Sequence, residues 1–232
     1  ILDLFSRMEL RALLAAPTGR AAKRLQEVTG QEASTIHRLL ESQLDPATGQ
    51  LIFTRDEDNP LKAHAVIVDE TSMVDLPLLA SLLRALPTGC RLILVGDPDQ
   101  LPPVGPGCPL SDILRSGVVP AVRLTEIFRQ AQESLIVMNA HRVNSGVMPD
   151  LKTVTSDFFF LRRRTEEAVA STIGDLCRTR LPDRMGIPPE EIQVLSPTRK
   201  GPTGTASLNL LLQAQLNPPA PDKKEKKWGD FS

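Results

Sequence analysis

Aromatic residues and long apolar runs are both scarce in this chain of 232 residues. Seven phenylalanines, one tryptophan and no tyrosine are present, so we do not expect extensive stacking of nucleic-acid bases. No apolar run approaches the roughly 20 residues of a membrane-spanning helix, so an integral membrane protein is excluded. The chain also lacks an excess of charge of one sign, because 27 basic and 28 acidic residues leave a net charge of −1. Any contact with nucleic acid must therefore be local.

Cysteine is rare as well, with three residues at wide spacing: Cys90, Cys108 and Cys177. An odd number at this spacing fits neither a disulfide framework nor a metal cluster. We instead expect the cysteines to be free thiols that pack as small apolar side chains, in a protein of the reducing cytoplasm. The chain starts at Ile1 without a methionine or a signal peptide, so we expect it to be an excerpt from a longer protein.

The fold class follows from short apolar runs that alternate with amphipathic helices. Buried strands are predicted at 13–16, 65–68 and 91–95, and a helix at 76–86. Nearly unbroken apolar strands of this kind indicate a parallel sheet with helices on both faces, an α/β fold.

Residues 43–61 interrupt this rhythm with turn residues around a short β-prone run, which predicts a small inserted hairpin. We therefore expect a first domain over 1–145 that contains this hairpin. Residues 150–217 are expected to form the beginning of a second domain, and the Pro- and Lys-rich tail 218–232 is expected to be mobile. Beyond the first strands, further strands are predicted at 121–124, 157–161 and 192–195, and helices at 133–145, 165–180 and 204–216.

Asp69 and Glu70 directly follow the predicted strand at 65–68. Parallel sheets place ligands at the carboxyl ends of their strands. There, one carboxylate can support Mg²⁺ while the other orients a water for attack on a phosphate. Taken alone the pair is a weak signal, because acids that merely cap a helix produce the same pattern.

The next predicted strand also ends in a polar loop, Gly96-Asp97-Pro98-Asp99-Gln100, which leads into a further run rich in proline and glycine. Glycine allows close backbone approach, proline stiffens the loop, and the Gln100 amide both donates and accepts hydrogen bonds. Two neighbouring strands with such loops at one edge favour a functional site over a purely structural turn.

Several segments together resemble the RecD-like branch of superfamily-one DNA helicases. They stand in the family's order, the resemblance covers about 1–217, and it extends to 196–204 in the second domain. Its motifs occupy 16–22, 34–40, 69–73, 96–107 and 124–130. The resemblance implies a RecA-like P-loop NTPase motor domain followed by the start of a second RecA-like domain.

The resemblance also implies roles in ATP hydrolysis. Asp69 is similar to the acid that supports Mg²⁺ through water, and Glu70 to the base that activates the hydrolytic water. Gln100 is similar to the γ-phosphate sensor, and Arg129 to the arginine that neutralises charge on the transferred phosphoryl group. All four are therefore expected to form the catalytic and ATP-binding set.

For single-stranded DNA and its junctions with duplex, the resemblance implies two contacts in the first domain and one in the second. The expected contact residues are Thr18, Gly19, Arg20, Thr35, His37, Pro197 and Thr198. A hydroxyl, free backbone N–H groups and a cation suit a phosphate, although a lone histidine is more often a packing residue. The hairpin at 43–61 lies where this branch carries a strand-separating pin.

The phosphate-binding motif G-x-x-x-x-G-K-[ST] is absent from the 232 residues. The family's order places it upstream of Ile1, and the last motor motifs beyond Ser232. We therefore expect an ATP-dependent 5′–3′ DNA helicase whose present segment alone hydrolyses little or no ATP. A non-catalytic nucleic-acid-binding or interaction remnant of a helicase gene remains the alternative. An RNA-directed ATPase is disfavoured only by the family likeness.

Overall fold

The computed structural model describes residues 1–124, 133–154 and 157–218, which form two compact units. The described part up to residue 124 lies in the first unit, and the part from 133 lies in the second. Among these described residues, no helix is long and apolar enough to cross a membrane.

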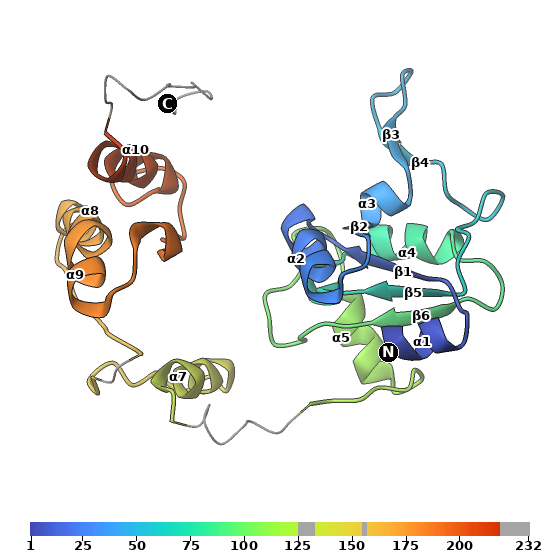
Figure 1. The fold of residues 1–232 in the computed structure, drawn as a ribbon, viewed down its shortest axis with the longest axis horizontal. Coiled ribbons are helices and arrows are strands. Elements are labelled where there is room, and N and C mark those ends of the chain that lie inside the picture. The colour runs from blue at the N-terminus through green and yellow to red at the C-terminus, as the bar shows by residue number, and fades with distance from the viewer. Residues whose placement is uncertain (125–132, 155–156, 219–232) are drawn as a thin grey trace. The chain divides into compact units, whose positions relative to one another are not determined.

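The first unit is built on a four-stranded parallel sheet, as the sequence predicts (Figure 1). Its strands run in the order β2-β1-β5-β6 and comprise β1 (Ala12–Ala16), β2 (Ala33–Thr35), β5 (Ala65–Val68) and β6 (Arg91–Leu94). All four residues of β5 are buried, because it lies between two neighbours with helices above and below. The predicted α/β fold class is thereby confirmed.

The register aligns the carboxyl ends of all four strands. Ala16 of β1 is opposite Thr35 of β2, and Val68 of β5 is opposite Leu94 of β6. From β1 the chain continues to β2 on one side, and the later strands lie on the other side. The direction in which the chain adds strands to the sheet therefore reverses between β1 and β5. Open α/β sheets bind ligands at such a switch point.

Two apolar clusters cover the two faces of the sheet, because successive strand residues point to opposite sides. On one face, Phe5 of α1 (Leu2–Arg7) and Leu25 of α2 (Gly19–Thr29) pack against Leu14 and Ile67. On the other face, Ala15, Val66 and Val68 pack against residues of α3 (Ile36–Leu39) and α4 (Leu76–Arg84). Burying both faces explains why the strands are apolar throughout rather than alternating.

The predicted insertion is a β-hairpin that projects away from the sheet (Figure 1). Its antiparallel strands are β3 (Ser42–Leu44) and β4 (Leu51–Phe53), so the hairpin is shorter than predicted and 54–61 forms a connecting loop. At its base, Arg55 lies 2.6 Å from Glu41 Oε1, and the Thr54 hydroxyl donates to Glu41 Oε2 at 2.9 Å. These hydrogen bonds, that from Arg55 above all, lower the pKa of Glu41.

The described residues of the second unit form helices and loops, with no strand. The helical elements are α7 (Leu135–Asn144), α8 (Glu166–Asp175), the π-helical turn η2 (Leu176–Arg180), α9 (Leu181–Met185), the 3₁₀ turn η3 (Pro189–Glu191) and α10 (Thr205–Leu216). The helices predicted in this part are present. The first of them, α7, groups with the second unit because Asn139 exchanges two hydrogen bonds with the backbone of Asp150.

The strands predicted at 121–124, 157–161 and 192–195 are wrong, since none of these segments is a strand in the structure. Each has a β-prone composition, but a strand also needs a hydrogen-bonded neighbour, which composition cannot supply. A second RecA-like domain therefore stays a prediction for this part of the chain. The predicted tail lies, from residue 219 onward, outside the described residues.

Candidate functional site

The two predicted acids lie at the carboxyl edge of the sheet. The Asp69 backbone N–H donates to the carbonyl of Ala15 at 2.9 Å, which extends the pairing of β5 with β1 by one step. The Asp69 side chain is half-buried, and its Oδ1 accepts the Glu70 N–H at 2.9 Å. The carboxylate of Glu70, also half-buried, has no hydrogen-bond or ion-pair partner among the described residues. An unpaired carboxylate at this edge remains available to a water or a ligand.

Glu70 adopts a left-handed conformation with φ 53°. This conformation is unfavourable for a non-glycine residue, at a cost of order 1–3 kcal/mol. It bends the chain sharply from β5 into the short 3₁₀ turn η1 (Thr71–Met73). Thr71 secures the bend, because its hydroxyl donates to Val68 O at 3.0 Å and its N–H donates to Val95 O at 2.9 Å. The backbone around Glu70 is therefore held in place from both strands.

The loop after β6 crosses directly over η1, and Gly96 makes this crossing possible. A Cβ atom at Gly96 would lie 3.0 Å from Leu110 Cδ2 and 3.1 Å from the backbone nitrogens of Thr71 and Ser72. Such distances are shorter than van der Waals contact. The missing side chain of Gly96 thus permits the close packing of this loop on η1.

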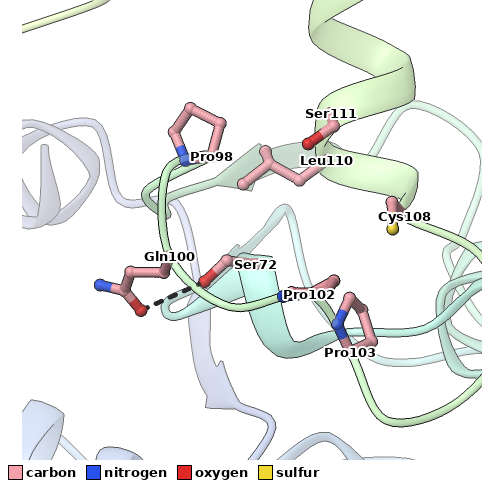
Figure 2. Close-up of a pocket in the computed structure, with 8 residues that line it drawn as sticks. All are labelled: Ser72, Pro98, Gln100, Pro102, Pro103, Cys108, Leu110 and Ser111. Carbon is pink, nitrogen blue, oxygen red and sulfur yellow. Dashed lines mark hydrogen bonds between the residues drawn. The ribbon is translucent and has the colours of Figure 1, made fainter. Parts of the chain in front are cut away.

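The crossing brings Gln100 to Ser72. The Ser72 hydroxyl donates to Gln100 Oε1 over a long 3.5 Å. Beside this pair lies an open pocket of about 160 Å³ that also reaches Cys108 and Ser111 (Figure 2). The structure therefore joins the segment after β5 to the segment after β6, as the sequence predicts, and leaves open space beside them.

The far end of the same loop is fastened to helix α4. Asp75 Oδ1 accepts the Leu78 N–H at 2.9 Å and so caps the helix, while the Leu76 N–H donates to Pro106 O at 3.0 Å. Gly105 packs so tightly on the Asp75 carboxylate that no Cβ atom fits there. Sequence reasoning did not identify Ser72 or Asp75 as site residues. The N-capping pattern Asp-Leu-Pro at 75–77 is a local signal for Asp75, and Ser72 lies within the motif segment 69–73.

The carboxyl edge of the sheet could hold Mg²⁺ only together with water and phosphate oxygens. The described residues contain no group of three or more His, Cys, Asp or Glu side chains that could hold a metal ion by themselves. Mg²⁺ in nucleotide sites needs only one or two carboxylates, with water and phosphate oxygens as its other ligands. Asp69, half-buried at the sheet edge, fits that arrangement.

Two of the predicted DNA contacts lie at the same edge, after β1 and β2. The Thr18 hydroxyl caps α2 by accepting the Ala21 N–H at 3.3 Å, and the Thr35 hydroxyl caps α3 by accepting the Arg38 N–H at 3.1 Å. Thr35 is the register partner of Ala16, so the structure brings the two segments together. Gly19 and Arg20 are exposed in the first turn of α2. The first domain thus presents both predicted segments on one side of β5.

His37 has a packing role in the structure, with its ring centroid 5.8 Å from that of Phe53 in the hairpin. Pro197 and Thr198 are exposed in the second unit, where Thr198 belongs to a loop that Ser196 braces through a 2.7 Å hydrogen bond to Thr203 O. Arg129, the fourth predicted catalytic residue, lies outside the described residues.

Comparisons with known proteins agree with the motifs. Residues 1–106 match the AAA domain family. The chain is 40% identical over 218 residues to the ATP-dependent RecD2 DNA helicase of Deinococcus radiodurans, a match that covers 94% of this chain and 28% of that protein. It is 42% identical over 120 residues to the RecBCD enzyme subunit RecD of Mycolicibacterium smegmatis, covering 45% of this chain and 21% of the subunit.

Among solved structures, the crystal structure of Bacteroides sp Pif1 in complex with ADP-AlF4 is 27% identical and covers 50% of this chain and 29% of that chain, with a TM-score of 0.33. The resemblance to RecD-like helicases is confirmed by the sequence matches. The chain spans less than a third of the length of either curated relative.

Proposed function

We propose that this chain, a relative of the RecD-type helicases over most of its length, is part of an ATP-driven motor that moves 5′ to 3′ along single-stranded DNA and separates duplex strands. The observation that carries the proposal is the joined edge of β5 and β6. Asp69 and Glu70 follow β5 there, and the Ser72–Gln100 pair next to them lines an open pocket. An acidic pair and a donor-bearing amide at adjacent strand ends are among the groups that hydrolysis of a nucleoside triphosphate uses.

In this proposal Glu70 acts as the base for the attacking water. Its carboxylate makes no hydrogen bond within the described chain, so it is free to accept a proton from water. Asp69 is already oriented by the Glu70 N–H and would hold Mg²⁺ through water. The bound metal would supply positive charge opposite the phosphate oxygens.

Gln100 and Arg129 would read and neutralise the terminal phosphate. The Gln100 amide can donate two hydrogen bonds to a phosphate oxygen, and a guanidinium can donate two more in parallel. Because the loop of Gln100 packs on η1 at Gly96, a movement of the amide would be transmitted to the backbone next to Glu70. This link supports coupling between the state of the nucleotide and the rest of the domain.

Single-stranded DNA would cross the carboxyl edge of β1 and β2. Thr18, Gly19 and Arg20 offer a hydroxyl, backbone N–H groups and an exposed cation to a phosphate, and Thr35 and His37 provide the neighbouring contact. At a junction with duplex, the projecting hairpin would act as the wedge between strands. In the second unit, Pro197 and Thr198 would add a further contact.

One sequence observation favours a second candidate, a non-catalytic nucleic-acid-binding remnant of a helicase gene. The 232 residues contain no G-x-x-x-x-G-K-[ST] motif, so they lack the usual anchor for the β- and γ-phosphates. Hydrolysis assays must therefore use the complete gene product.

The test is Glu70→Gln in the complete gene product, with Glu57→Gln as the matched control. Glu57 is an exposed acid in the loop between the hairpin and β5. Loss of the base should lower the rate of ATP hydrolysis by about 10²-fold or more, while the affinity for ATP stays within about twofold. The control should match the wild type in both measurements. Equal hydrolysis by wild type and Glu70→Gln would show that Glu70 is not the base.

A further inference from the structure

Ser72 lies between the two halves of the candidate site, and the function proposed above gives its side chain no role of its own. It is 7% exposed, in the turn η1 two residues after Glu70. Its hydroxyl makes one hydrogen bond within the described chain, to Gln100 Oε1. A buried hydroxyl proton needs an acceptor, because leaving it unpaired costs free energy. Ser72 therefore gives its proton to the oxygen of the Gln100 carboxamide.

The direction of this hydrogen bond decides what Gln100 presents to its surroundings. A carboxamide has an acceptor oxygen on one side and an N–H₂ donor on the other. With the oxygen held by Ser72, the nitrogen turns away from η1, as Figure 2 shows. In the opposite rotamer the nitrogen would face Ser72 and the oxygen would face outward. An outward oxygen would repel a phosphate, since both are hydrogen-bond acceptors that carry negative charge.

We propose that Ser72 is a positioning residue that turns the Gln100 carboxamide so that its two N–H donors face the terminal phosphate of the bound nucleotide. The inference rests on the proposed function, because it assumes that Gln100 meets a phosphate. Its geometric basis is the burial of Ser72 and the close packing of η1 under the Gln100 loop at Gly96. Ser72 acts only through Gln100 and touches no reacting atom.

The length of the contact sets the size of the effect. At 3.5 Å the bond is longer than the usual 2.7–2.8 Å between two oxygens, so it biases the amide without fixing it. A net contribution typical of a weak hydrogen bond corresponds to about a three- to tenfold change in rate. Hydrogen bonds in catalytic sites commonly shorten when the substrate binds.

The first experiment measures ATP hydrolysis by the complete gene product in a double-mutant cycle. Ser72→Ala should lower kcat by about three- to tenfold and leave KM for ATP within about twofold. In a Gln100→Ala background, Ser72→Ala should cause no further loss, because the group through which it acts is gone. The matched control is Ser81→Ala, which removes a serine hydroxyl bonded to Pro77 O on helix α4 and should match the wild type. An undiminished effect of Ser72→Ala in the Gln100→Ala background would overturn the proposal.

The second experiment does not need ATP hydrolysis and so separates this proposal from the proposed function. In the 232-residue chain labelled with [¹⁵N]glutamine, Gln100→Ala assigns the side-chain amide signals of Gln100 by their disappearance. Ser72→Ala should shift these signals, and Ser81→Ala should leave them in place. Unchanged Gln100 signals in Ser72→Ala would refute the positioning role. A further outcome is that the wild-type complete gene product shows no DNA-stimulated hydrolysis while Ser72→Ala still shifts the Gln100 signals. That outcome would refute the proposed function and leave the hydrogen bond as a structural contact.

Discussion

Replacing Gly96 by alanine tests whether the loop after β6 and the turn η1 form one packed unit. The added Cβ atom would lie 3.0 Å from Leu110 Cδ2 and 3.1 Å from the backbone nitrogens of Thr71 and Ser72. Relaxed contacts between such atoms are about 3.5 Å or longer, so the overlap is roughly half an ångström at three places. The Leu110 side chain can move aside. The two backbone nitrogens cannot do so easily, because the Thr71 N–H is bonded to Val95 O at 2.9 Å.

Overpacking of this kind costs typically about 1–3 kcal/mol. The backbone at Gly96 is not left-handed, so the loss comes from crowding alone. Gly19→Ala is the matched control, since nothing lies within 4 Å of a Cβ atom at that position and its φ is not positive. A glycine-to-alanine change at a permissive site stabilises by about 0.4–1 kcal/mol through the unfolded state. The two substitutions should therefore act in opposite directions.

Hydrogen exchange of the Thr71 amide is the direct assay, because that amide bridges η1 and the end of β6. A loss of 1–2 kcal/mol should speed exchange through local or global opening by a factor of about 5–30. Gly19→Ala should leave the Thr71 exchange rate unchanged or slow it. Exchange at Thr71 that is equally slow in Gly96→Ala and in the wild type would mean that the two segments are not packed as described.

Two further predictions concern a helix cap and a carboxylate. Thr18→Ala removes the cap of α2 and should lower the free energy of unfolding by about 1 kcal/mol. It should also weaken the binding of single-stranded DNA to the complete gene product, measured by fluorescence anisotropy. Thr165→Ala, which removes the equivalent cap of α8, should cost similar stability without changing DNA affinity; equal loss of affinity in both would argue against a DNA contact at Thr18. Hydrogen bonds, first that from the Thr153 hydroxyl, hold the pKa of Asp150 at about 2. Because this pKa lies below the ordinary value of 3.8, the contribution of Asp150 to stability is present above about pH 4 and is lost as the pH falls towards 2. Thr153→Val should raise the pKa in a carbon-detected NMR titration, and an unchanged pKa would contradict this assignment of cause.

The parts of the fold that local sequence dictates were predicted well. The apolar runs at 65–68 and 91–95 are β5 and β6 to within one residue, and the run at 13–16 is most of β1. Their composition is sufficient because both faces of the sheet are covered by helices. The strand β2, by contrast, was missed: its three residues carry no periodic signal, and its identity depends on pairing with β1.

The same distinction applies to the candidate site: its residues could be located from the local sequence, but the contacts between distant residues could not. Asp69, Glu70 and Gln100 could be located because each follows an apolar strand along the chain. The Ser72–Gln100 contact, however, joins residues 28 positions apart, and the requirement for glycine at position 96 arises from the chain that passes beneath it. Nor did any local signal indicate the left-handed backbone of Glu70, which depends on the bonds that Thr71 makes to both strands.

The most direct measurement of the central claim is the rate of phosphate release from ATP by the complete gene product, with and without single-stranded DNA. If the polar groups after β5 and β6 face a triphosphate while the edge of β1 and β2 holds DNA, adding DNA should raise the rate several-fold or more, and ADP should inhibit it. A rate that stays at background in the presence of saturating ATP, Mg²⁺ and single-stranded DNA would contradict the account.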